Sequence, residues 1–366
     1  MKENTINLVE LKSRAKYWLV RADGGKYYDQ FKYERFVSVH HNEVTLSDLQ
    51  TTELLLTKEK TLTHYKNVIT KIYGADVLTK HQVTFAAKRL YSFIEEMSIG
   101  DYVIVPSWKS NYFLIGQIIE DVSELTKIPE LKFNHGYTTT TDLKRRKVNW
   151  INEVPRKKIN SKFLYSTLTM HHSIIEVTQF SKYIDGLISP LYFKDGRLNL
   201  RLTVNTEEAI TTDAWRSLYQ IIEMERNHEI EEEIIATSNV ESPGDINLQA
   251  IGQFISENHW MFQSGLLVIA ALFGDVDIKG VKFQGLFPYL HTRAMEKLDK
   301  RQKTVEVETL EKDAELKDIL REIDIEKARK ELQAIRNLEI TVDSPSVHYA
   351  DEYQTRMDFD DSPGEG

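Results

Sequence analysis

Between residues 16 and 154 the chain alternates short aromatic and β-branched stretches with glycine, aspartate and proline. The stretches are YWLVRA, RFVSVH, DYVIVPSW, YFLIGQII and RKVNWINEV, and each has the composition of a β-strand. Residues 50–75 and 84–97 predict helices among these strands, the second one ending before Gly100. This first part of the chain is therefore expected to be rich in β-structure with a few added helices.

The second half of the chain mixes strands and helices. Residues 187–204 predict a hairpin about the Asp195–Gly196 turn, and residues 211–233 predict a helix with an acidic end. Residues 253–273 are apolar on nearly every helical face, so this stretch is expected to be the buried centre of a domain or of a homo-oligomer. The pattern of both halves predicts the α+β class.

Five regions are expected along the 366 residues. They are a leader arm (1–15), a first domain (16–178), a mixed α+β domain (179–289), a long charged helix or short coiled coil (290–342) and a disordered acidic tail (343–366). Favourable i,i+4 pairs such as Glu308–Lys312 and Glu326–Lys330 support the charged helix.

Charge is distributed unevenly. The formal net charge is −9, yet residues 126–163 hold ten lysines and arginines against three acidic residues. Such a basic segment can attract a polyanion locally while the remaining chain repels it. The candidate phosphate contacts are Lys144, Arg145, Arg146 and Arg156. A lysine-rich loop that faces solvent explains the same residues equally well.

Cysteine is absent, which excludes disulfides and cysteine metal sites and fits a reducing compartment. The N-terminus has no uninterrupted apolar stretch typical of a secretory signal, and the apolar run 266–273 is far too short to span a membrane. The expected protein is soluble and cytoplasmic, with no membrane partner.

Catalytic motifs are missing from the sequence. It contains no P-loop, dinucleotide-binding, nucleophile-elbow or kinase pattern, so we assign no catalytic residue, cofactor or metal ligand. One alternative is a magnesium-dependent nuclease in residues 240–285, with Asp245, Asp277 and Lys279 as its site. Three-residue matches of this kind are frequent by chance. The pairs His40–His41 and His171–His172 lack metal-ligand spacing.

The order of elements over residues 16–178 resembles the EVE branch of PUA-like domains. YWLVRADGG, VTLSDL, AAKRLYSFIEEMSIGDYVIVPSW and YFLIGQIIEDV follow one another as in that family. The stretch RKVNWINEVPR (146–156) is similar to the closing R-K-V-x-W-x-x-x-V-P-R element of EVE-like modules in bacterial restriction and anti-phage proteins. Two departures occur. Arg21-Ala22-Asp23-Gly24 stands in place of K-S/T-E-P, and His40-His41-Asn42-Glu43 in place of G-W-N-E.

This resemblance implies a small β-barrel whose pocket takes a flipped modified base or a nucleotide-like ligand. Aromatic faces would stack on the base and polar groups would contact its edge. The implied ligand-binding residues are Trp18, Arg21, Asp23, His41, Asn42, Ser107, Trp108 and Trp150. We expect Trp18 and Trp108 to line one pocket.

The leading hypothesis is accordingly a sensor of modified DNA or of a nucleotide-like ligand in a bacterial defence setting. Its second domain would assemble the protein as a homo-oligomer or pass the signal to an effector protein. The alternatives are the nuclease described above and an oligomeric scaffold whose barrel is inert.

Overall fold

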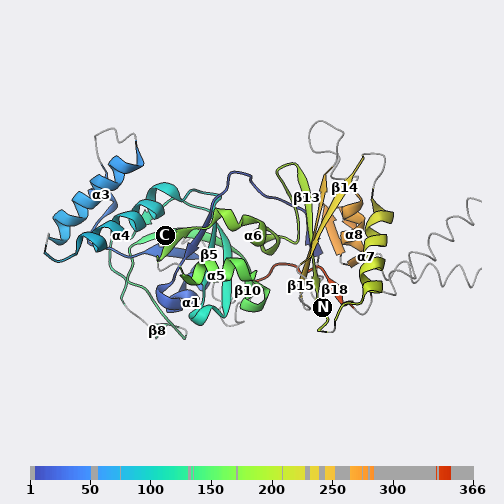
Figure 1. The fold of residues 1–366 in the computed structure, drawn as a ribbon. Coiled ribbons are helices and arrows are strands. Elements are labelled where there is room, and N and C mark those ends of the chain that lie inside the picture. Colours follow the sequence, from blue (N-terminus) through green and yellow to red (C-terminus); the bar gives the residue numbers. More distant parts are fainter. Residues whose placement is uncertain are drawn as a thin grey trace, which may run out of the picture. The chain divides into compact units, whose positions relative to one another are not determined.

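The computed structural model describes residues 5–50, 57–74, 76–130, 133–134, 136–169, 172–207, 209–226, 231–238, 244–251, 264–273, 275–278, 281–283, 335 and 338–347. The chain forms two compact units (Figure 1). The first in sequence, here the groove unit, comprises residues 14–188 together with the segment from Pro345 onward. The other, here the sandwich unit, comprises residues 1–13 and 189–344. Both mix strands with helices, which confirms the α+β class.

A curled sheet forms the centre of the groove unit. Among the described residues its strand order is β11-β3-β5-β6-β10-β4, with β7 paired to β10. The strands are β3 (Tyr17–Val20), β4 (Phe36–Val39), β5 (Tyr102–Pro106), β6 (Tyr112–Ile118), β7 (Ser123–Glu124), β10 (Lys144–Pro155) and β11 (Ile174–Glu176). A small hairpin, β8 (Phe133–Asn134) and β9 (Tyr137–Thr138), lies beside it in sequence.

Strand β10 curls the sheet because its two halves have different partners. Residues 144–147 pair with β4, whereas residues 148–155 pair with β6 across an irregularity between Trp150 and Asn152. A bulge of this kind bends a strand and increases its twist. The sheet thus resembles half of a barrel, and within the described residues its outer strands β11 and β4 do not pair with each other.

Helices cover this sheet. They are α1 (Tyr28–Tyr33), α2 (Leu46–Leu49), α3 (Lys58–Tyr73), α4 (Lys80–Tyr91), α5 (Ser161–Thr169) and α6 (Ser181–Ile188). Thr79 starts α4 with a capping box, in which its hydroxyl accepts from the Gln82 amide and the Gln82 side chain accepts from the Thr79 amide. Helix α3 packs along α4 (Figure 1).

The single-turn elements of this unit are η1 (Asp23–Gly25), η2 (Ser92–Glu96), η3 (Trp108–Ser110), η4 (Arg156–Lys158) and η5 (Thr178–Phe180). Helix α4 continues directly into η2, so the helix predicted over residues 84–97 corresponds to these two elements together. Its apolar residues Leu90, Phe93 and Met97 are buried in the core of the unit, as their helical spacing predicts.

The described residues of the sandwich unit form two sheets. One has the order β14-β15-β13-β12-β2, with β18 paired to β13, and the other has the order β1-β16-β17. The strands are β1 (Thr5–Asn7), β2 (Val9–Glu10), β12 (Leu191–Lys194), β13 (Arg197–Val204), β14 (Glu233–Ser238), β15 (Gly244–Ile251), β16 (Asp275–Ile278), β17 (Val281–Phe283) and β18 (Ile340–Thr341). Helices α7 (Thr212–Glu225) and α8 (Gly265–Phe273) complete it.

The N-terminal segment differs from the expected leader arm. Strand β1 pairs in parallel with β16, and β2 pairs in parallel with β12, so residues 5–10 belong to the sandwich unit. The structure also divides the chain after Ile188, ten residues beyond the expected boundary, because α6 packs on β6 and β10. Sequence pattern could not show either feature, since both depend on pairing between segments far apart in the chain.

Helix α8 is the described part of the apolar stretch 253–273. Leu266, Ile269 and Ala270 are buried in the same core as α7 and the larger sheet. The helix is therefore covered within one copy of the chain, and its burial does not require a homo-oligomer. No helix among the described residues is both long and apolar enough to cross a membrane. Most of the expected charged helix (290–334) and of the acidic tail (348–366) lies outside the described residues.

Candidate functional site

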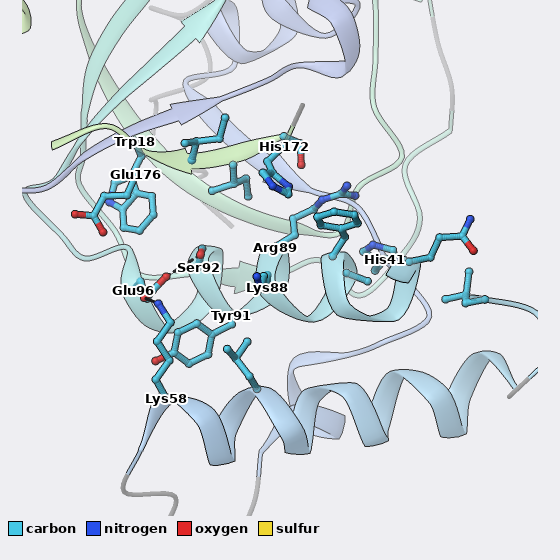
Figure 2. A pocket seen from close by; sticks show the side chains of 18 residues that line it. Trp18, His41, Lys58, Lys88, Arg89, Tyr91, Ser92, Glu96, His172 and Glu176 are labelled. Carbon is cyan, nitrogen blue, oxygen red and sulfur yellow. Dashed lines mark hydrogen bonds and ion pairs between the residues drawn. The ribbon is translucent and has the colours of Figure 1, made fainter. Parts of the chain in front are cut away.

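A groove of about 990 Å³ crosses the groove unit between α4 and β11 (Figure 2). Strand β3 contributes Trp18, the start of α3 contributes Lys58, and the loop after β4 contributes His41. The remaining lining comes from Leu62 on α3, Leu78 just before α4, and residues of α4, η2 and the segment 172–176. Figure 2 shows two different ends, one with Arg89, His41 and His172 and the other with Lys58, Tyr91 and Glu96.

The first end carries two cationic side chains without direct ion pairs among the described residues. Lys88 and Arg89 both lie on α4, and neither side chain has a hydrogen bond or ion pair with another described residue. Arg89 is half-buried, and burial lowers the pKa of its guanidinium while the charge of Asp142 raises it. Asp142 is already hydrogen-bonded to Ser38 and His40. A half-buried cation without a direct ion-pair partner is costly, so this end is suited to an anion.

Aromatic rings lie beside Arg89. The Phe85 and His172 rings are 4.7 Å apart at 55°, and the His81 ring meets Phe85 edge-on at 4.1 Å. His172 is exposed to solvent. A planar group could stack there while its anionic part reaches Arg89.

His41 has an unusual backbone and an unusual pKa. Its φ is +87°, in the left-handed region that histidine seldom adopts. Its Nδ1 lies 3.2 Å from the Tyr73 hydroxyl, which donates to the Glu43 carboxylate at 2.5 Å. Nδ1 must therefore be the donor, which leaves Nε2 as an acceptor, and Nε2 has no partner among the described residues. Burial, with the charge of Arg89, lowers the pKa of His41 to about 4.

This low pKa predicts a pH effect on stability. In the unfolded chain His41 takes up a proton near its ordinary pKa of 6.5, whereas in the folded protein it stays neutral until about pH 4. The free energy of unfolding should therefore fall, by about 1 to 2 kcal/mol, between pH 7 and pH 5 on account of this residue. His41→Asn, which tolerates positive φ, should remove this part of the fall.

Urea unfolding of both proteins at pH 7 and pH 5 checks the prediction. Parallel pH profiles for the wild type and His41→Asn would contradict it. His40 affects the free energy of unfolding in the opposite direction, because its hydrogen bond to Asp142 raises its pKa and so stabilises the folded protein as the pH falls. It is present in both proteins and does not obscure the difference between them.

The second end of the groove is internally neutralised. Lys58 pairs with Glu96, and the Ser92 hydroxyl donates to the same carboxylate at 2.7 Å. Lys16 and Glu176 lie 3.8 Å apart beside it. The charge of this end is already satisfied, so the anion-binding capacity of the groove is concentrated near Arg89.

Trp18 and Trp150 serve the core. Trp18 is 1% exposed and its indole donates to Asp101 at 2.9 Å, so only its edge reaches the groove wall. The Trp150 indole donates to the Phe31 carbonyl at 2.7 Å from within the same core. Neither tryptophan presents a free face for a base.

Trp108 lies away from this groove. It follows β5, is 64% exposed and does not line the cavity that contains Trp18. Its neighbours are Ser107, whose hydroxyl accepts from the Tyr112 amide, and η1, which carries Asp23. The two tryptophans expected in one pocket are therefore separated. Trp18 lies opposite Val103, near the start of β5, whereas Trp108 comes after the end of that strand.

The predicted polar contacts Arg21 and Asn42 bind protein backbone. Arg21 donates to the carbonyls of Thr167 and His172, and Asn42 bridges Thr141 and Leu143. Both side chains position loops near the groove, and His172 is one of the groove residues so positioned. Only His41 among the polar candidates lines the groove itself.

The predicted phosphate contacts divide into buried and exposed residues. Lys144 is fully buried, where it pairs with Glu124 at 3.0 Å and donates to the His41 carbonyl. Arg146 is 1% exposed and donates to the carbonyls of Phe93 and Ile94. Arg145 stacks on Phe36 with 4.1 Å to the ring centroid. Of these four residues only Arg156 is exposed. Lys144 and Arg146 are buried because alternate residues of a strand point to the same side, here toward the core.

The residues of the nuclease alternative do not form a described site. Asp245 pairs with Arg201 at 2.8 Å in the β13–β15 sheet, while Asp277 belongs to β16 in the other sheet. Lys279 lies outside the described residues. Across the described ranges no three histidine, aspartate or glutamate side chains cluster as metal ligands.

Sequence reasoning missed Lys88 and Arg89. The apolar spacing of residues 84–97 predicts the helix and its buried side, and it assigns no role to the charged positions. Arg89 directly precedes the buried Leu90, so on a helix it sits at the edge of the apolar face. This position at the edge of the apolar face was the sequence signal for a half-buried cation. That Arg89 lines a groove depends on the packing of β11 near α4, which the sequence does not show.

No protein-family model and no curated protein sequence matches this chain. Among solved structures, the chain is similar to the YTH domain of the Zygosaccharomyces rouxii MRB1 protein, determined in complex with N6-methyladenosine RNA. The match has 10% sequence identity and a TM-score of 0.25, and it covers 49% of this chain and 90% of that one. A likeness at this level does not establish a shared fold.

Proposed function

We propose that the groove unit binds a nucleotide-like ligand, with its phosphate at Lys88 and Arg89 and its base beside His172 and Phe85. The carrying observation is Arg89, a half-buried cation whose guanidinium has no hydrogen bond or ion pair with another described residue and feels the charge of Asp142 only from beyond ion-pair distance. A phosphate would supply the direct contacts through charge-assisted hydrogen bonds. The adjacent rings, 4.7 Å apart, suit the planar part of the same ligand.

The resemblance to EVE-like modules extends this proposal in two ways. It favours a modified base, free or extruded from DNA, over an ordinary nucleotide. It also favours a role as a sensor in bacterial defence, in which the sandwich unit passes the signal to an effector protein or to another copy. The residues of the groove support the ligand class, and the sensor role rests on the sequence motifs alone.

Calorimetric titration tests the groove. The probes are the four 5′-deoxymononucleotides, the corresponding nucleosides, and 5-methylcytosine and N6-methyladenine mononucleotides. Each nucleotide should bind more tightly than its nucleoside, because the phosphate meets Arg89. Arg89→Gln should weaken nucleotide binding about 10- to 100-fold, as expected for one lost charge-assisted contact, and should leave nucleoside binding unchanged.

Lys71→Gln is the matched control, since Lys71 is exposed on α3 and does not line the groove. It should retain wild-type affinity. The proposal fails if nucleosides and nucleotides bind equally, or if the two variants lose affinity alike. Tighter binding of a methylated base than of its plain counterpart would support the modified-base extension.

A further inference from the structure

The turn between β5 and β6 presents aromatic side chains to solvent. Trp108 is 64% exposed and Tyr112, four residues later, is 50% exposed. Single exposed apolar residues are common on protein surfaces. Two large exposed aromatic residues within one short turn are less common. The backbone conformation of this turn is also unusual.

The backbone holds the turn rigidly in a strained conformation. Lys109 and Ser110 both have φ of +55°, although neither is glycine. The Ser107 amide donates to the Tyr112 carbonyl and the Ser110 amide to the Ser107 carbonyl, each at 2.9 Å. On the inner side, a side chain at Gly25 would lie 2.3 Å from the Trp108 nitrogen, so η1 packs directly on the turn. Strain that the surroundings enforce is typical of binding sites.

Positive charge surrounds the same turn. The Arg156 amide donates to the Asn111 carbonyl at 2.8 Å, and its guanidinium contacts the Lys109 carbonyl at 3.3 Å. Lys109, Arg156 and Lys157 are exposed, and no acidic partner for them exists among the described residues. The element η1, which packs on this turn, carries one acidic residue, Asp23, and this residue is exposed.

We propose that this surface, defined by Trp108, Lys109, Arg156 and Lys157, binds single-stranded nucleic acid. Trp108 stacks on an unpaired base, and the three cations contact phosphates on either side of it. An exposed aromatic ring flanked by cations without acidic partners matches the way such strands are bound without sequence preference. The whole chain has a formal net charge of −9, so the acidic remainder would repel the polymer and favour binding at this surface. The proposal rests on different residues from the nucleotide groove.

Fluorescence anisotropy with a labelled 12-nucleotide single-stranded DNA tests the proposal on the full chain. Trp108→Ala should weaken binding about 5- to 100-fold, as expected for one lost base stack. Arg156→Gln and Lys157→Gln should each flatten the salt dependence by about 0.7 in the log–log slope. Asp23→Asn, which keeps tolerance of positive φ, should strengthen binding because it removes a repulsive charge.

The controls separate this surface from the groove. Arg89→Gln should retain wild-type affinity for the 12-mer, whereas Lys157→Gln should retain wild-type affinity for mononucleotides. No binding of the 12-mer, or unchanged affinity and salt slope in the Trp108 and Lys157 variants, overturns the surface proposal and leaves the groove proposal standing. Loss of 12-mer binding in Arg89→Gln alone would assign the polymer to the groove and likewise overturn it.

Discussion

Replacing Arg146 with methionine should lower the free energy of unfolding of the groove unit by about 3 kcal/mol. Arg146 is 1% exposed, and its guanidinium donates to the Phe93 carbonyl at 2.8 Å and the Ile94 carbonyl at 3.0 Å. Both carbonyls belong to η2, where the helical ladder of α4 ends. Methionine fills similar space but leaves these buried acceptors without a donor, and each unpaired group costs about 1 to 3 kcal/mol.

Hydrogen–deuterium exchange of peptides from β5, β6 and β10 measures the effect, because these strands form the core of the unit. Lys147→Gln is the matched control at the next position. Lys147 is 62% exposed and paired with Glu120, so its loss should cost less than about 1 kcal/mol. If Arg146→Met keeps full protection and instead weakens nucleic-acid binding, Arg146 is a phosphate contact, as its place in the basic segment first suggested.

The contrast between these neighbours shows where sequence reasoning reached its limit. Counting charges identified a basic segment, and that count is correct. It could not show that Lys144, Arg146 and Val148 share one face of β10 while Arg145 and Lys147 share the other, because the register was unknown. Successive residues of a strand point to opposite faces, so two of the four consecutive cations are buried in the core and the other two lie on the opposite face of the strand.

Local pattern was more reliable for elements than for their assembly. The helix over residues 84–97 and the hairpin about Asp195–Gly196 follow from spacing and turn chemistry, and both are present. The pairing of β1 and β2 with strands more than 180 residues away follows from no local signal. The same holds for the candidate site, because His41 was predicted from its motif whereas the groove depends on α4 packing near β11.

Replacing Gly25 with alanine should destabilise the groove unit by about 3 kcal/mol or more. The added Cβ would lie 2.3 Å from the Trp108 nitrogen and 2.6 Å from the Ser107 carbonyl carbon. Both are backbone atoms, so no side-chain rotation relieves the overlap. The φ of +96° adds a penalty for any residue other than glycine. Because η1 can only move away from the turn after β5, Trp108 should lose its fixed position as well.

Gly24→Ala separates the two causes of this loss. Its φ is +68°, but no atom lies within 4 Å of the added Cβ, so it should cost only the backbone penalty of about 1 to 2 kcal/mol. Exchange of the β5 and β6 peptides measures stability, and anisotropy with the 12-nucleotide strand measures the Trp108 surface. Gly25→Ala should weaken strand binding and Gly24→Ala should preserve it. Equal stability of the two variants would mean that η1 does not brace the turn, and the rigid presentation of Trp108 would lose its structural basis.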